Sequence, residues 1–172
     1  MRPAARIRAF SLIEVVIAVG LFAGSIVVII GLLGTLSRQA ADSADVLTAQ
    51  RLPESVRVEL ARLAGNGFNG LAAQIPVMAA PLDHGFALVA DREAAEVQSP
   101  NVTPPAALIP ADAQYFLVEC WRFPAEPLAF TGAKAFLALH VRVSWPYRVP
   151  GAAAPVPLAE RSQTTFAVSL NR

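Results

Sequence analysis

The feature that most constrains this chain is a run of 22 residues, 15–36, that contains no charged residue and no proline. Only Ser25 and Thr35 are polar within it. As an α-helix with a rise of about 1.5 Å per residue, the run would be about 33 Å long, which is enough to cross the ~30 Å hydrocarbon core of a bilayer. We therefore expect one membrane-spanning helix near the N-terminus, followed by a globular domain.

Charge is distributed unevenly around this run. Arg2, Arg6 and Arg8 precede it, and no acidic residue is found before Glu14. Of the 14 basic side chains these three lie before the run, which leaves 11 against 13 acidic ones, a formal charge of −2. The positive-inside rule predicts that the N-terminus is cytoplasmic and that the chain after Leu36 lies across the membrane. No basic stripe with interleaved aromatic residues remains, so we expect no nucleic-acid binding.

One carboxylate, Glu14, lies directly before the uncharged run. A charge at the bilayer centre costs at least ~2.5 kcal/mol on insertion scales, so an acid in a membrane span is a functional hypothesis by default. A cleaved secretory signal would explain the arginines, but its apolar region should be only about 7–15 residues long. A plain signal anchor would explain the length but would leave Glu14 without a role, its side chain reaching back to cytoplasmic water.

A third interpretation explains all of these features. The segment that begins at Phe10 reads FSLIEVVIAVGLFAG and follows the nine-residue leader MRPAARIRA. It resembles the N-terminal signature of the type IV pilin and type II secretion pseudopilin family. The resemblance implies that a prepilin peptidase cuts between Ala9 and Phe10, that the new N-terminus at Phe10 is methylated, and that Glu14 is the fifth mature residue. Ala9 stands where the family usually has glycine.

The same resemblance implies a role in assembly for Glu14. In a filament, Glu14 of one subunit would meet the terminal amine of Phe10 in its neighbour, because both charges are costly alone in hydrocarbon and much less costly as a pair. The glycines expected to provide helix flexibility and packing are Gly20, Gly24, Gly31 and Gly34. Among them, Gly31 occupies the position at which many major pilins have a kinking proline.

The residues after the span are expected to continue as an amphipathic helix. Its apolar face is predicted by spacings of four, four and three between Leu52, Val56, Leu60 and Leu63. Pro53 should kink the helix or break it near Leu52. The predicted organisation is a basic leader at 1–9, a transmembrane and assembly helix at 10–37, an amphipathic continuation at 38–64 and a globular antiparallel-sheet domain at 65–172.

The globular part contains four segments with the composition or alternation of strands. They are residues 85–90, 114–123, 135–145 and 162–170. The predicted core face of the third consists of Leu137, Leu139, Val141, Val143 and Trp145. We expect an irregular connector at 68–81, and prolines exclude most regular structure at 93–110. Short connections between sequential strands favour an antiparallel meander, so the predicted fold class is α+β, with a long N-terminal helix packed on a small sheet, as in pilins.

The sequence shows no pattern typical of catalysis or metal binding. It has no cysteine pair, Walker loop or nucleophile motif, and His84 and His140 are far apart. Cys120, the only cysteine, is expected to be a buried apolar side chain. The acidic loop residues, too scattered to predict a calcium site, are Asp83, Asp91 and Asp112. We expect no enzymatic activity, no cofactor and no metal.

These features together predict a structural subunit of a type IV pilus or a type II secretion pseudopilus. A minor subunit is expected, since the C-terminal part lacks the cysteine pair and the calcium-type loop of many major members. The expected partners are the prepilin peptidase, other pilin or pseudopilin subunits and the inner-membrane assembly platform. The expected location is the bacterial inner membrane, with a periplasmic globular domain, and then the filament. The alternative is a single-span periplasmic binding module that keeps its leader, does not polymerise and uses the proline-rich loop 100–110 to bind a partner.

Overall fold

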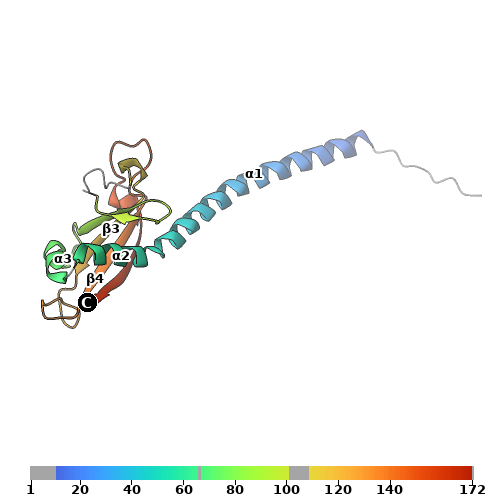
Figure 1. The fold of residues 1–172 in the computed structure, drawn as a ribbon. Helices are drawn as coiled ribbons and strands as arrows, with labels where there is room; N and C mark the ends of the chain where they lie inside the picture. The colour runs from blue at the N-terminus through green and yellow to red at the C-terminus, as the bar shows by residue number, and fades with distance from the viewer. Residues whose placement is uncertain (1–10, 66, 101–108, 172) are drawn as a thin grey trace, which may run out of the picture. The chain divides into compact units, whose positions relative to one another are not determined.

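The structure, a computed structural model, describes residues 11–65, 67–100 and 109–171 (Figure 1). Its helices are α1 (Leu12–Ala49), α2 (Leu52–Ala64) and α3 (Phe68–Gln74). Its strands are β1 (Phe86–Ala90), β2 (Val97–Gln98), β3 (Phe116–Arg122), β4 (Phe136–Trp145) and β5 (Ser162–Asn171). The chain divides into two compact units, Met1–Ala44 and Asp45–Arg172. The first contains most of α1, and the second contains the sheet with α2 and α3.

The strands form one antiparallel sheet in the order β2-β1-β3-β4-β5. The consecutive strands β3, β4 and β5 are neighbours, and β4 and β5 pair over ten residues each. The predicted antiparallel meander and the α+β fold class are therefore confirmed. Each of the four predicted strands is present, and its observed bounds lie within two residues of those expected from the sequence.

A short break separates α1 from α2 at Gln50 and Arg51. The amide of Arg51 donates to the carbonyl of Thr48, three residues earlier, at 3.0 Å. This turn is tighter than a turn of α-helix, in which the acceptor is four residues earlier. Pro53 has no N–H with which to extend α1, but its fixed backbone angle suits the first turn of a new helix, where it is found. The predicted break near Leu52 is confirmed.

Helix α2 buries its apolar face against the sheet. Leu52, Val56 and Leu60 are fully buried, and Leu63 is partly buried against the same core. In Figure 1, α2 lies across the strands. The predicted core face of β4 is also buried, with all five of its residues, Leu137, Leu139, Val141, Val143 and Trp145, in the core.

The expectation of an irregular connector at 68–81 is wrong in its first half. Residues 68–74 form the helix α3. The buried residues that recur there with helical spacing are Phe68, Leu71, Ala72 and Ile75. The pattern is easily missed because the helix is only seven residues long and contains Gly70, a weak helix former.

The proline-rich segment after β1 also contains regular structure that the sequence pattern does not indicate. The two-residue strand β2 pairs with β1 through Val89↔Gln98 and Ala90↔Val97. Residues 101–108, the centre of the predicted loop, lie outside the described residues.

The sheet face opposite α2 is also buried where β3 and β4 meet, although strand alternation predicted only one core face. Glu119 and Arg142 are direct cross-strand neighbours with side chains 8% and 10% exposed, and Arg142 Nη2 donates to Glu119 Oε2 at 2.7 Å. Arg161, from the segment between β4 and β5, donates to the Val156 carbonyl at 2.7 Å and to Ser144 Oγ at 3.3 Å. Removing either Glu119 or Arg142 would leave the other charge buried without a partner, so the carboxylate and the guanidinium depend on each other.

Asp45, at the start of the second unit, is held by two residues distant in the sequence. Arg92 donates to its two carboxylate oxygens at 3.1 and 3.2 Å, and the Tyr115 hydroxyl donates to Oδ2 at 2.6 Å. The Arg92 guanidinium also lies 4.9 Å from the centre of the Tyr115 ring. The hydrogen bond to Asp45 is the main reason that the pKa of Arg92 is raised. The end of α1 is thereby tied to the β1–β2 connection and to the residue before β3.

We predict that Asp45→Asn lowers the free energy of unfolding of the globular unit by about 1–2 kcal/mol, because a neutral Asn loses the charge-assisted hydrogen bonds from Arg92. The loss is moderate because the Arg92 side chain is accessible to water, which can solvate its charge. Urea titration followed by tryptophan fluorescence measures this, since both tryptophans, Trp121 and Trp145, are buried in that unit. The control is Glu54→Gln, which removes an exposed ion pair with Arg57. Equal midpoints for the two variants would contradict the assigned role of Asp45.

Candidate functional site

The candidate site is the N-terminal part of α1, and it begins with a capped helix end. Ser11 precedes the first helical residue, and its hydroxyl oxygen accepts a hydrogen bond from the amide of Glu14 at 3.3 Å. The Ser11 carbonyl accepts from the amides of Glu14 and Val15 at 3.1 and 3.3 Å. Ser-x-x-Glu is the pattern of a capping box, and a carboxylate in the first helical turn is favoured by the helix dipole. This spacing is a sufficient signal for the cap in the sequence, although only Glu14 was predicted as a functional residue there.

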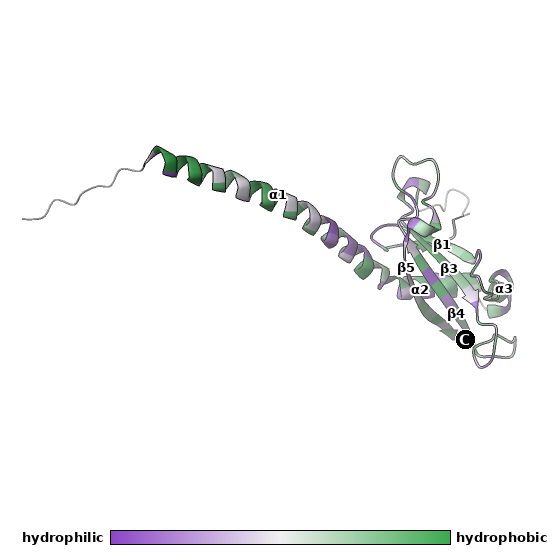
Figure 2. Cartoon of the chain, turned by 180° about the vertical axis from the view of Figure 1, so that it is seen from behind, coloured by the Kyte–Doolittle hydropathy of each residue, from purple (hydrophilic) through white to green (hydrophobic). Residues whose placement is uncertain are grey.

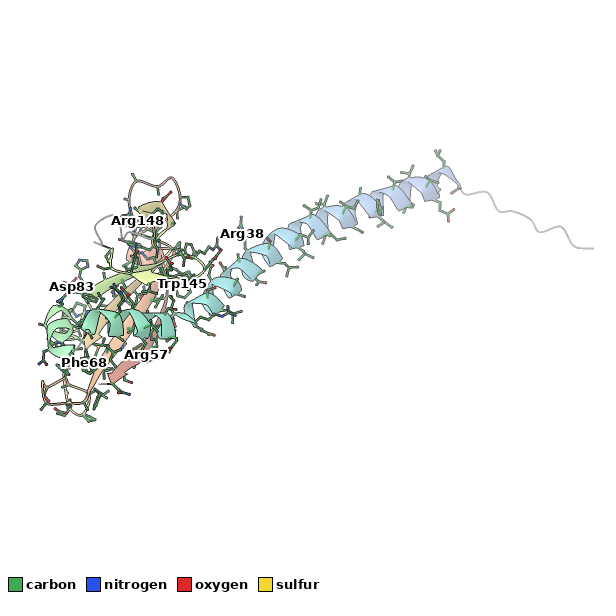
Figure 3. The ribbon with its side chains drawn as sticks, viewed as in Figure 1. Arg38, Arg57, Phe68, Asp83, Trp145 and Arg148 are labelled. Carbon is green, nitrogen blue, oxygen red and sulfur yellow. The ribbon has the colours of Figure 1, made fainter. Side chains whose placement is uncertain are left out.

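The surface of α1 after Glu14 is apolar on all sides. Every residue from 15 to 36 is exposed in the structure. Figure 2 shows the green, hydrophobic part of α1 giving way to purple toward its C-terminal end, and Arg38, labelled in Figure 3, is the first charge after the run. In the described part of the chain, this is the one helix long and apolar enough to cross a membrane. Soluble monomers rarely expose an apolar surface of this extent, so the helix requires lipid or other protein around it.

The two hydroxyl groups within the run are satisfied by the helix itself. Ser25 Oγ donates to the Leu21 carbonyl, and Thr35 Oγ1 donates to the Leu32 carbonyl, both at 2.8 Å. Such internal bonds remove most of the cost of placing a hydroxyl in hydrocarbon. Glu14 is therefore the polar side chain of the segment that still requires a partner: among residues 11–65, 67–100 and 109–171, no cation forms an ion pair with its carboxylate.

The four glycines predicted to serve helix packing lie on one side of α1. With about 100° between successive residues, they fall within an arc of about 80°. Gly20 and Gly24 border a shallow hollow with Leu21, Ser25 and Ile29. A Cβ atom added at Gly20, Gly24, Gly31 or Gly34 would have no neighbour within 4 Å. Contacts within this chain therefore do not require glycine there, whereas the close approach of another helix would.

The two residues of the predicted cleavage site, Ala9 and Phe10, lie outside the described residues. The first described residue, Ser11, follows them directly. Of the residues around the predicted cleavage site, the structure shows Ser11 and Glu14 in contact. The expected pairing of Glu14 with the amine of Phe10 stays a prediction.

Cys120 is enclosed by the sheet core. The residue is completely buried on β3, as expected. Burial, followed by the charge of the neighbouring Glu119, raises the pKa of its thiol to about 12. A thiol in this state is a poor nucleophile, because the reactive species is the thiolate.

The histidines and loop aspartates occupy separate places in the globular unit. The side chain of His84 is 98% exposed and lies 3.7 Å from Asp83. His140 lies near Trp121, with 6.1 Å between ring centres, and its pKa is lowered by burial and by the charge of Arg142. Within the described ranges, no group of three or more His, Cys, Asp or Glu side chains is arranged to hold a metal ion.

No protein-family model, curated protein or solved structure matches this chain. A function therefore has to be argued from the residues. Those of the N-terminal segment provide a capped helix start, one carboxylate without an ion-pair partner among the described residues, an exposed apolar surface and one stripe of glycines.

We predict that Cys120 in the folded protein does not react with a maleimide at mildly alkaline pH. A thiol pKa of about 12 in place of 9.0 lowers the thiolate fraction about 1000-fold. Labelling is followed by mass spectrometry before and after unfolding in guanidinium chloride. Val149→Cys, at a residue 46% exposed, is the positive control. Native labelling of Cys120 at the rate of the Val149→Cys thiol would show that the sheet opens readily.

Proposed function

We propose that this chain is a structural subunit, a minor one, of a filament of the type IV pilus or type II secretion pseudopilus class. The observation that carries the proposal is the helix α1, which is capped by Ser11, has Glu14 in its first turn and continues with 22 uncharged, exposed residues before an α+β domain. A carboxylate at that point has a purpose if a cation meets it in the assembled state.

Cleavage between Ala9 and Phe10 by a prepilin peptidase supplies such a cation. The cut creates an α-amine at Phe10, which stays positively charged after one methylation. Phe10 directly precedes the capping residue Ser11 in the sequence, so the cut would create the new N-terminus at the start of the apolar segment. Pairing of this amine with Glu14 of the neighbouring subunit offsets two costs of burial and sets the axial register of the subunits.

The remaining features of α1 support packing of helices against one another. An uncharged helix loses little on moving from lipid to a bundle of similar helices, because both surroundings are apolar. The glycine stripe allows another helix to approach its backbone closely. The basic leader favours a cytoplasmic N-terminus, so that α1 spans the bacterial inner membrane and the globular unit lies in the periplasm. Partners are then the peptidase, other subunits and the assembly platform in that membrane.

A second candidate is favoured by one residue. Ala9 replaces the small glycine that usually precedes the cut, and a chain that is not cut would remain a single-span anchor for a periplasmic binding module. Such a module would not polymerise, and Glu14 would lie near the cytoplasmic interface. Processing separates the two candidates.

We predict that co-expression with a prepilin peptidase yields a chain that starts at N-methyl-Phe10, nine residues shorter than the original. Intact mass and N-terminal sequencing of the membrane-extracted protein measure this. Ala9→Gly should be cut at least as fully, whereas Ala9→Leu should not be cut. A chain that still starts at Met1 with the peptidase, while Ala9→Gly is cut, would favour the anchored module.

We predict that Glu14→Gln is processed and inserted but fails to co-assemble with partner subunits. An unpaired terminal amine in an apolar interface costs about 3–5 kcal/mol, which corresponds to a loss of at least ~100-fold in subunit association. Co-purification of sheared filaments measures incorporation. Glu160→Gln, at an exposed residue of the globular unit, is the matched control and should assemble normally. Normal incorporation of Glu14→Gln would refute the register role.

A further inference from the structure

Strand β5 ends the sheet on one side and has the properties of an unprotected edge. It pairs with β4 in continuous register from Ser162 to Asn171. Its outer side therefore presents a straight row of main-chain N–H and C=O groups that no other described strand pairs with. The strand SQTTFAVSLN contains no charged residue and no proline.

The opposite edge of the sheet is different. It is formed by β2, which is only two residues long. Natural sheets protect their edges with short strands, lysines, prolines or bulges. The β2 edge has the first of these devices, whereas β5 has none of them along its ten residues.

A groove runs along the second half of β5. One hollow of about 540 Å³ is bordered by Arg51, Pro53 and Arg57 of the α2 region and by residues 167–169 of β5. A second hollow of about 340 Å³ shares Arg57 and continues to Leu170. Figure 3 labels Arg57 on α2. Both hollows lie between the α2 region and β5, and no residue of β4 lines them, so they border the β5 edge at which an added strand would lie.

We propose that β5 pairs antiparallel with β5 of a second copy of this chain, so that two five-stranded sheets join into one. The main-chain groups of this edge can pair with an extended partner, as in other cases of strand addition. Two uncharged strands bring no like charges together, and an antiparallel pair of identical strands has two-fold symmetry and closes at two copies. Strand β2, with two residues, is too short to take the place of the second β5.

The side chains beside the edge have both signs of charge, as a self-complementary interface needs. Arg51 and Arg57 are basic, Glu54 is acidic, and all three border the first hollow. In one copy, Arg57 and Glu54 form an ion pair at 2.6 Å with side chains 51% and 69% exposed. Because these groups are accessible, they can exchange partners across the two-fold axis without leaving a charge unpaired.

Cross-linking through one introduced cysteine per chain, in detergent micelles, tests this pairing, because the native Cys120 is completely buried. Exposed β5 residues on the face away from α2 are replaced one at a time: Gln163→Cys, Thr165→Cys, Ala167→Cys and Ser169→Cys. Each variant is oxidised alone and in mixtures of two. We expect the pairs that cross-link to share one sum of residue numbers, which is the signature of antiparallel strands. A constant difference between residue numbers, or no cross-link above that of Val149→Cys, would overturn the proposal.

A charge on the edge provides a second test that does not depend on cysteine geometry. Ala167→Lys places two like charges at the joint and should convert the dimer to monomer in light scattering, while Ala152→Lys, in an exposed turn, should leave it unchanged. Retention of the dimer in Ala167→Lys would also overturn the proposal. Repeating the cross-linking in Glu14→Ala distinguishes β5 pairing from assembly through α1, because the β5 cross-links should persist whether or not filaments form.

Discussion

The uncharged run from Val15 to Leu36 needs surroundings other than water, and this need governs the N-terminal segment. The helix satisfies its own main chain and the hydroxyls of Ser25 and Thr35, so neither opposes burial. Glu14 is the exception, since its amide is capped by Ser11 but its carboxylate has no ion-pair partner among the described residues. In the proposed filament, the amine of Phe10 from a neighbouring subunit would be the cation that meets this carboxylate.

The globular unit is organised by contacts between residues distant in the sequence. Asp45 fixes the end of α1 by accepting hydrogen bonds from Arg92 and Tyr115, which lie 47 and 70 residues further along the chain. Pro53 allows α2 to start in a new direction and to bury its apolar face on the sheet. On the other face, the Glu119–Arg142 pair fixes which strand residues face each other, because either charge alone would be costly when buried.

Sequence patterns predicted the long, regular elements of the fold well. Strand β4 alternates over ten residues, and the face with Leu137 and Val141 is the core face as expected. The pattern failed for α3 and β2, which are seven and two residues long. Elements this short carry too few apolar positions to show a period, and packing against the rest of the unit determines their conformation. Of the candidate site, Glu14 was found from the sequence, while the cap by Ser11 was missed.

The uncharged span, the carboxylate at its start, the break at Pro53 and the alternation of the long strands follow from the sequence, because each depends on residues close together in the chain. Only the tertiary structure decided that Asp45 meets Arg92 and Tyr115, and that the centre of the sheet is buried on both faces. It also decided that β5, rather than a better protected strand, is the long free edge. These properties arise from long-range pairing, in which the partner of a residue is set by the packing of the whole unit and leaves no local pattern.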